Sequence, residues 1–216
     1  MAPRTASGFT LIEVAIVLVV VGLLLGAVLM GQQLITSARV RAVIQQQDGF
    51  KAAYFGFIDR YRQLPGDYTG ATANIPGVST AACGAVGSFG NGNGNAQIES
   101  ANGEFILVWE HLSKSGFVNS AYTCTGNAVV DSGTAPRNAH GQYLQLIYDN
   151  VYAGSAPQAR HNLKTGNGIP SDVLREVDIK TDDGNALQGS FRGSTYTSGA
   201  ATNATCWDTT SGSWAS

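Results

Sequence analysis

The run from Phe9 to Gly31 is the feature that most constrains the fold of this chain, because it is long, apolar and carries a single charge, Glu13. As an α-helix, its 23 residues would reach about 35 Å, more than the roughly 30 Å hydrocarbon core of a membrane. Between positions 14 and 30 lie twelve Val, Ile or Leu residues. They favour insertion by about 4–7 kcal/mol, whereas one acidic side chain at mid-membrane costs about 2.5–3.5 kcal/mol. The sequence therefore predicts a membrane-spanning helix that contains Glu13.

The position of Glu13 needs its own explanation, because an ionisable group inside a spanning segment requires a partner or access to water. No basic residue follows within helical reach, since positions 16, 17 and 20 are Ile, Val and Val. The nearest cations upstream are Arg4 and any chain terminus created by cleavage. Two interpretations follow: a tolerated glutamate that reaches water at the interface, or a functional carboxylate with a specific partner.

The segment before the apolar run, "MAPRTASG", is short, carries Arg4 and ends in Gly8, which Phe9 follows. A secretory signal would be cut after its apolar stretch at a small-residue site, and "VLMGQQL" offers no such site. The junction "GFTLIE" from Gly8 to Glu13, followed by the apolar helix, resembles the prepilin signal of the type IV pilin and pseudopilin superfamily. The resemblance implies cleavage between Gly8 and Phe9 by a prepilin peptidase on the cytoplasmic face, N-methylation of Phe9, and Glu13 as the fifth residue of the mature chain.

The same resemblance implies a role for the lone carboxylate. In a filament, Glu13 would pair with the free amine of Phe9 on a neighbouring subunit, so that two charges costly in an apolar core neutralise each other only in register. The implied function is that of a structural subunit of a type IV pilus or of a type II secretion pseudopilus, and not of an enzyme. The alternative is a minor pilin whose head binds a surface, a substrate or another ligand.

Implied partners are other pilin or pseudopilin subunits, the prepilin peptidase, the pilus or secretion assembly machinery, and the membrane. The resemblance places the chain in the inner membrane as a single-pass protein with its head in the periplasm, and afterwards in a periplasmic or cell-surface filament. With a formal net charge of −2 and no basic patch interleaved with aromatic residues, no nucleic-acid partner is expected.

The apolar pattern beyond the span predicts that the helix continues. Apolar residues recur at steps of three and four up to Pro65-Gly66, which ends the pattern, and Gln47 fills one apolar slot. We therefore expect a cleaved leader at 1–8, a transmembrane helix at 9–31, an amphipathic continuation at 32–64 and a head at 65–216. The stripe that the head should cover comprises Val40, Val43, Phe50, Tyr54, Phe57, Tyr61 and Leu64.

The head shows short patterns of both kinds of secondary structure. "EFILVWEHL" and "PSDVLREVDIK" predict helices, while "GQYLQLIYD" and "GSFRGSTYT" predict strands. The "GNGNGN" stretch is predicted to be the loosest part of a long loop. The predicted fold class is α+β: a long N-terminal helix packed on a small, pilin-like head with an antiparallel β-sheet.

Few residues suggest chemistry. Cys83, Cys124 and Cys206 predict one disulfide and one remaining thiol, with the pairing left open. His111, inside a predicted helix, is interpreted as structural rather than as a general base. No catalytic motif is present, and no cofactor is expected apart from calcium.

The segment "DIKTDDGN" is the one candidate metal site. Asp178, Asp182, Asp183 and Asn185 gather hard oxygen ligands around a glycine turn, which suits calcium, although their spacing departs from the EF-hand loop. The competing interpretation is a turn in which Asp and Asn side chains cap a helix.

Overall fold

The computed structural model describes residues 10–83, 88–124, 129–194 and 206–215, so Gly8 and Phe9 lie outside the described part. The chain divides into two compact units, Met1–Arg39 and Val40–Ser216.

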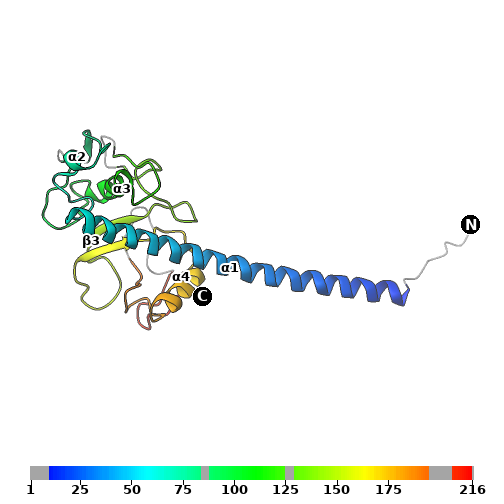
Figure 1. Cartoon of the computed structure of the whole chain (residues 1–216). Helices are drawn as coiled ribbons and strands as arrows, with labels where there is room; N and C mark the ends of the chain where they lie inside the picture. Colours follow the sequence, from blue (N-terminus) through cyan, green and yellow to red (C-terminus); the bar gives the residue numbers. More distant parts are fainter. Residues whose placement is uncertain (1–9, 84–87, 125–128, 195–205, 216) are drawn as a thin grey trace, which may run out of the picture. The chain divides into compact units, whose positions relative to one another are not determined.

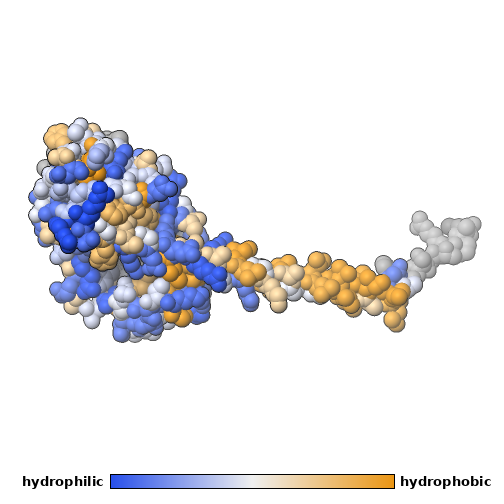
Figure 2. Space-filling view, viewed as in Figure 1, coloured by the Kyte–Doolittle hydropathy of each residue, from blue (hydrophilic) through white to orange (hydrophobic). Residues whose placement is uncertain are grey.

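Helix α1 (Leu11–Tyr61) is 51 residues long and contributes to both units (Figure 1). It is continuous because proline is missing from this stretch, and it ends where Arg62 takes a left-handed backbone conformation before Pro65. In the first unit its apolar side chains are exposed, and Figure 2 shows them covering the visible surface of its N-terminal part.

In the second unit, α1 buries one face. Val40, Val43, Gln47, Ala53 and Phe57 are its buried residues. The predicted stripe is therefore confirmed as buried at Val40, Val43 and Phe57, and the polar slot at Gln47 is 6% exposed. The other stripe residues, Phe50, Tyr54, Tyr61 and Leu64, are half-buried, and Ala53 joins the buried face without having been predicted.

The remainder of the second unit forms a small α+β head, which confirms the predicted fold class. Strand β1 pairs with β2, and β3 pairs with β4, both antiparallel; in the longer pair Gln145 lies opposite Lys164 and Asp149 opposite Arg160. The elements after α1 are α2 (Ala71–Asn74), β1 (Ala82–Cys83), β2 (Ser88–Phe89), α3 (Glu104–Lys114), β3 (Gln145–Asp149), β4 (Arg160–Lys164) and α4 (Ser171–Thr181).

The core of the head is built around α3, whose residues from Glu104 to Leu112 are all buried. The indole of Trp109 meets Phe50 of α1 edge to face, with ring centroids 5.0 Å apart. A smaller cluster joins α1 to α4 and to Ile169, two residues before α4; its members are Val40, Val43, Ile169, Val173 and Val177.

The predicted strand "GSFRGSTYT" is wrong over residues 189–194, which form no strand, and its remaining residues lie outside the described part. The backbone amides of this segment are used elsewhere, since Phe191 N donates to Asp182 Oδ2 at 2.8 Å and Gly193 N to Ala186 O at 2.9 Å. Strand β4, which the sequence analysis missed, is the actual partner of β3.

The "GNGNGN" stretch is organised rather than loose. Asp67 Oδ1 accepts a hydrogen bond from Gly94 N at 2.6 Å, and Asp67 Oδ2 accepts one from Ala96 N at 2.7 Å. The Asp67 carboxylate accepts hydrogen bonds from several backbone amides and so holds one conformation of a glycine-rich segment whose own side chains provide little constraint.

Candidate functional site

Glu13 lies in the first turn of α1 and is bound by Thr10. Its Oε2 accepts hydrogen bonds from the Thr10 backbone N–H and the Thr10 hydroxyl, both at 2.8 Å. The Glu13 N–H in turn lies 3.4 Å from Thr10 Oγ1, which completes a capping box. The T-x-x-E spacing of Thr10 and Glu13 is the sequence signal for this cap, and it was not among the predicted features.

This arrangement gives the carboxylate a local partner in the isolated chain. It also sets a negative charge at the positive end of the helix dipole. Glu13 is exposed, so no other described residue covers it.

Among the described residues, α1 is the one helix long and apolar enough to cross a membrane. None of its most apolar window is buried within the protein. Gly22 and Gly26 have no heavy atom within 4 Å of where a side chain would begin, so this face is open to a neighbouring helix.

The three buried polar residues of α3 hold the surrounding loops through hydrogen bonds. Glu110 accepts from Ser79 N at 2.6 Å and Cys124 N at 2.8 Å. Glu104 accepts from Asn93 N at 2.9 Å and Glu99 N at 3.0 Å, while burial raises the pKa of its carboxyl.

His111 uses both ring nitrogens in the same way. Nδ1 accepts from Gly66 N at 2.9 Å, and Nε2 lies 2.9 Å from Gly90 O, so Nε2 must carry the proton. Burial lowers the pKa of His111 to about 4. The imidazole is thus neutral and fully hydrogen-bonded, which agrees with the structural role expected for it.

The cysteine pairing left open by the sequence is settled in the structure: Cys83 bonds to Cys124, and Cys206 is a free thiol. The disulfide lies beside the Cys124 amide that Glu110 binds. It therefore strengthens an attachment between α3 and the loop that carries Cys124.

The structure brings together three of the four residues proposed as calcium ligands. Asp178, Asp182 and Asp183 each offer a carboxylate oxygen, and these oxygens lie within 4.8 Å of one another. Asp178 is fully buried; its Oδ2 accepts from Trp214 Nε1 at 2.7 Å, while its Oδ1 has no hydrogen-bond partner among the described residues. Burial raises the pKa of Asp178, although the Trp214 indole and the Gly184 amide act in the opposite direction. Asn185 Oδ1 accepts instead from Leu187 N at 2.9 Å.

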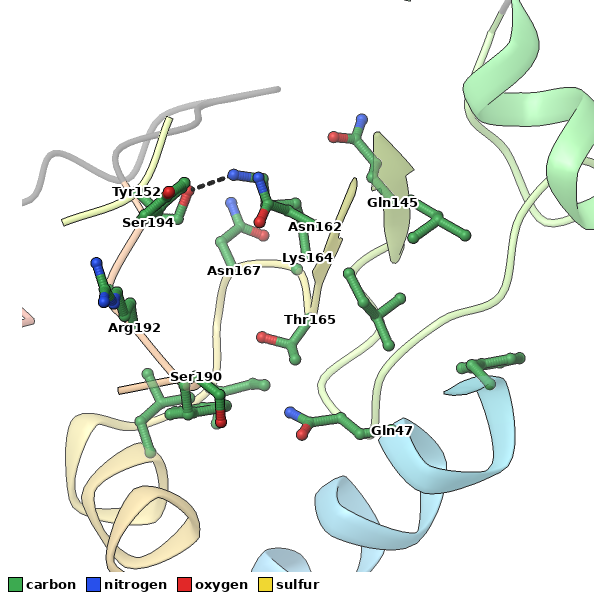
Figure 3. Close-up of a pocket in the computed structure, with 18 of the residues that line it drawn as sticks. Gln47, Gln145, Tyr152, Asn162, Lys164, Thr165, Asn167, Ser190, Arg192 and Ser194 are labelled. Carbon is green, nitrogen blue, oxygen red and sulfur yellow. Dashed lines mark hydrogen bonds between the residues drawn. The ribbon is translucent and has the colours of Figure 1, made fainter. Parts of the chain in front are cut away.

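The second unit also contains a pocket of about 850 Å³ that the sequence analysis did not foresee. Figure 3 shows Gln47 of α1, Gln145 of β3, Asn162 and Lys164 of β4, and Ser190 and Ser194 of the segment after α4 around it. Lys164 pairs with Asp149 at 3.1 Å beside this pocket.

No characterised protein and no solved structure matches the chain significantly. One family does match at the N-terminus, over residues 3–29, where the span and the Glu13 cap lie. There the chain carries the prokaryotic N-terminal methylation motif, which is the prepilin-type cleavage and methylation signal of type IV pilins and pseudopilins.

Proposed function

We propose that this protein is a structural subunit of a type IV pilus or of a type II secretion pseudopilus. The observation that carries the proposal is the methylation motif at residues 3–29 at the start of a long, exposed apolar helix. The motif implies processing by a prepilin peptidase and assembly with other pilin subunits. In this proposal the peptidase cuts after Gly8, Phe9 becomes the methylated N-terminus, and the head lies in the periplasm before assembly.

Glu13 is the assembly residue in this scheme. Within the described part of the chain, Thr10 is the one residue whose groups donate hydrogen bonds to this carboxylate, and both donors are neutral while the acceptor is charged. The amine of Phe9 on a neighbouring subunit would add the opposite charge, which in an apolar environment is a stronger partner than an amide or a hydroxyl.

Two measurements test this proposal. After coexpression with a prepilin peptidase, intact mass should correspond to residues 9–216, which is 208 residues, plus one methyl group. A Glu13→Gln variant should still insert in the membrane but fail to enter filaments, because the amide has the same size and no charge. Asp59→Asn, which removes an exposed acid outside the span, is the matched control. Retention of the leader, or normal filament entry by Glu13→Gln, contradicts the proposal.

For the head we propose a calcium ion held by Asp178, Asp182 and Asp183. Three converging carboxylates supply the oxygen ligands that calcium requires, and the buried Asp178 Oδ1 lacks any other described partner. A bound calcium ion would balance the negative charge of the buried Asp178 carboxylate and would hold the turn after α4 in place.

Calcium should raise the melting temperature of the wild-type protein relative to chelator, and magnesium should do so less, because the cluster is not a rigid octahedral cage. Asp183→Asn should remove most of this shift. Asp172→Asn, an exposed acid on α4 outside the cluster, should keep it. An equal calcium response in all three proteins rejects the site.

The second candidate function is a minor subunit whose head binds a ligand. The pocket in the second unit favours it, because a structural head needs no such cavity. Quantitative mass spectrometry of purified filaments separates the two: a major subunit dominates the filament mass, while a minor one is present in small proportion.

A further inference from the structure

The pocket of the head has an unusual charge distribution for this chain. Acidic residues outnumber basic ones, 15 to 13, yet among the described residues no Asp or Glu lines the pocket. Lys51, Arg160, Lys164 and Arg192 all do. A lining of this kind attracts an anion.

Among these cations, the two arginines can each offer several N–H groups to a ligand, and Nε of Arg192 already donates to Gly189 O at 2.8 Å. Lys164 already pairs with Asp149, but no described carboxylate forms an ion pair with Arg160 or Arg192. Both guanidiniums lie 5.4 Å from the ring centroid of Tyr152. Tyr152 thus contacts two arginines that both line the pocket, and each guanidinium offers several N–H groups to a carboxylate.

Neutral polar side chains provide a second type of partner. Gln47 and Gln145 are 6% and 4% exposed, and neither side-chain amide forms a hydrogen bond within the described part of the chain. In Figure 3 the Gln47 amide extends toward the space beside Thr165 and Ser190. Both glutamines line the pocket, so a ligand or water there can pair with their amide groups.

The two types of partner together define a ligand class. A simple inorganic anion accepts hydrogen bonds and would need only donors in the pocket. A side-chain amide offers both a donor and an acceptor, and it therefore suits a ligand group that also donates and accepts, such as a sugar hydroxyl. Aromatic rings from Tyr54, Tyr143 and Phe191 add flat apolar faces to the same lining. We propose that this pocket binds a sugar acid, with its carboxylate on Arg160 and Arg192 and its hydroxyls on Gln47, Gln145 and Ser190.

This inference deepens the second candidate function, in which the head of the subunit binds a ligand. Ligand binding by the pocket does not require filament assembly, because every lining residue lies at position 47 or later, outside the N-terminal span. Its failure would therefore leave the tests on Glu13 and on leader cleavage unaffected.

The experiment uses the full-length processed protein in detergent, with trigalacturonic acid as the probe and its methyl ester as the neutral match. The three tryptophans of the chain, Trp109, Trp207 and Trp214, all line the pocket, so intrinsic fluorescence reports occupancy directly and calorimetry gives the affinity. Arg160→Gln combined with Arg192→Gln should weaken binding at least about tenfold, as expected for lost charge-assisted hydrogen bonds. Arg41→Gln combined with Arg175→Gln changes the charge equally at exposed sites outside the pocket and should leave binding unchanged.

A further variant separates the hydroxyl contacts from the charge. Gln145→Leu should weaken trigalacturonate binding but not the binding of a triglutamate peptide, which lacks hydroxyls. Equal or tighter binding by monomeric galacturonate supports a free sugar acid as the ligand, and tighter binding by the trisaccharide supports a polysaccharide.

Several results would overturn the proposal. These are no saturation by trigalacturonate below about 10 mM, equal affinity for the methyl ester, unchanged affinity in the Arg160 and Arg192 double variant, and tighter binding of triglutamate or of a single-stranded oligonucleotide. Circular dichroism of each variant checks that the fold is retained.

Discussion

Acid should destabilise the head through His111 specifically, and the size of the effect follows from its surroundings. In the folded protein the pKa of His111 is about 4, whereas in the unfolded chain it has the ordinary value of about 6.5. Protonation would charge an imidazole that is fully buried, and would place a second N–H at Nδ1, where the Gly66 N–H already points. The folded state therefore resists a proton that the unfolded state accepts.

The direction and size follow from linkage. Above pH 6.5 both states are neutral at this position and the contribution is fully present. As the pH falls from about 6.5 to about 4, only the unfolded state gains the proton, so the free energy of unfolding decreases by about 1.4 kcal/mol per pH unit, or about 3 kcal/mol in all. That is a large part of the roughly 5–15 kcal/mol typical of a folded domain.

The assay compares the wild-type protein with His111→Gln, in full-length form in detergent, by near-ultraviolet circular dichroism during urea unfolding at pH 7.5 and pH 4.5. Glutamine is neutral at both values, so the variant should be less stable at pH 7.5 but should lose less stability on acidification. Other titrating groups contribute to both proteins and cancel in the difference. Parallel pH dependence in the two proteins would refute the reasoning about His111.

Two further predictions concern the covalent and backbone constraints of the head. Replacing both Cys83 and Cys124 by Ser should lower the free energy of unfolding by about 2–5 kcal/mol, and thiol titration of the native wild-type protein should find the Cys206 thiol alone, so that three reactive thiols would contradict the pairing. Gly66→Ala should cost more stability than Gly116→Ala in thermal melts, because both glycines have φ above +80° but only at Gly66 would the new methyl group meet a backbone oxygen, that of Glu104 at 2.7 Å. Equal destabilisation by the two alanines would show that the close contact has no effect.

The sequence predicted three of the four described helices, because each of these depends on local signals, whereas the four-residue helix α2 lies in a stretch that was predicted to be a loop. The apolar run without proline predicts α1, and apolar spacing predicts α3 and α4, each within a few residues of its observed bounds. Strand β4 was missed because "RHNLK" has a single apolar residue, Leu163. The strand predicted after α4 was wrong over 189–194, because Asp182 and nearby carbonyls take amides that a sheet would need.

Of the candidate sites, one could be predicted from the sequence and one could not. The acidic cluster could be read from the sequence because Asp182 and Asp183 are adjacent and Asp178 lies one helical turn before Asp182. The pocket could not, since it joins side chains from α1, β3, β4 and the segment near residue 190, and hydrophobic periodicity does not report which loops meet. The hydrogen bonds of the buried polar residues of α3 could not be predicted either, because their partners lie in loops that precede and follow α3 in the chain.

These buried polar side chains of α3 leave the side chains of the loops free to change. Glu104, Glu110 and His111 hold their neighbours through backbone amides and a carbonyl, which almost any residue supplies. Side chains at Ser79, Asn93 and Glu99 can therefore diverge during evolution without loss of these attachment points. The outer surface of the head can acquire new specificities while the helix beneath it stays the same.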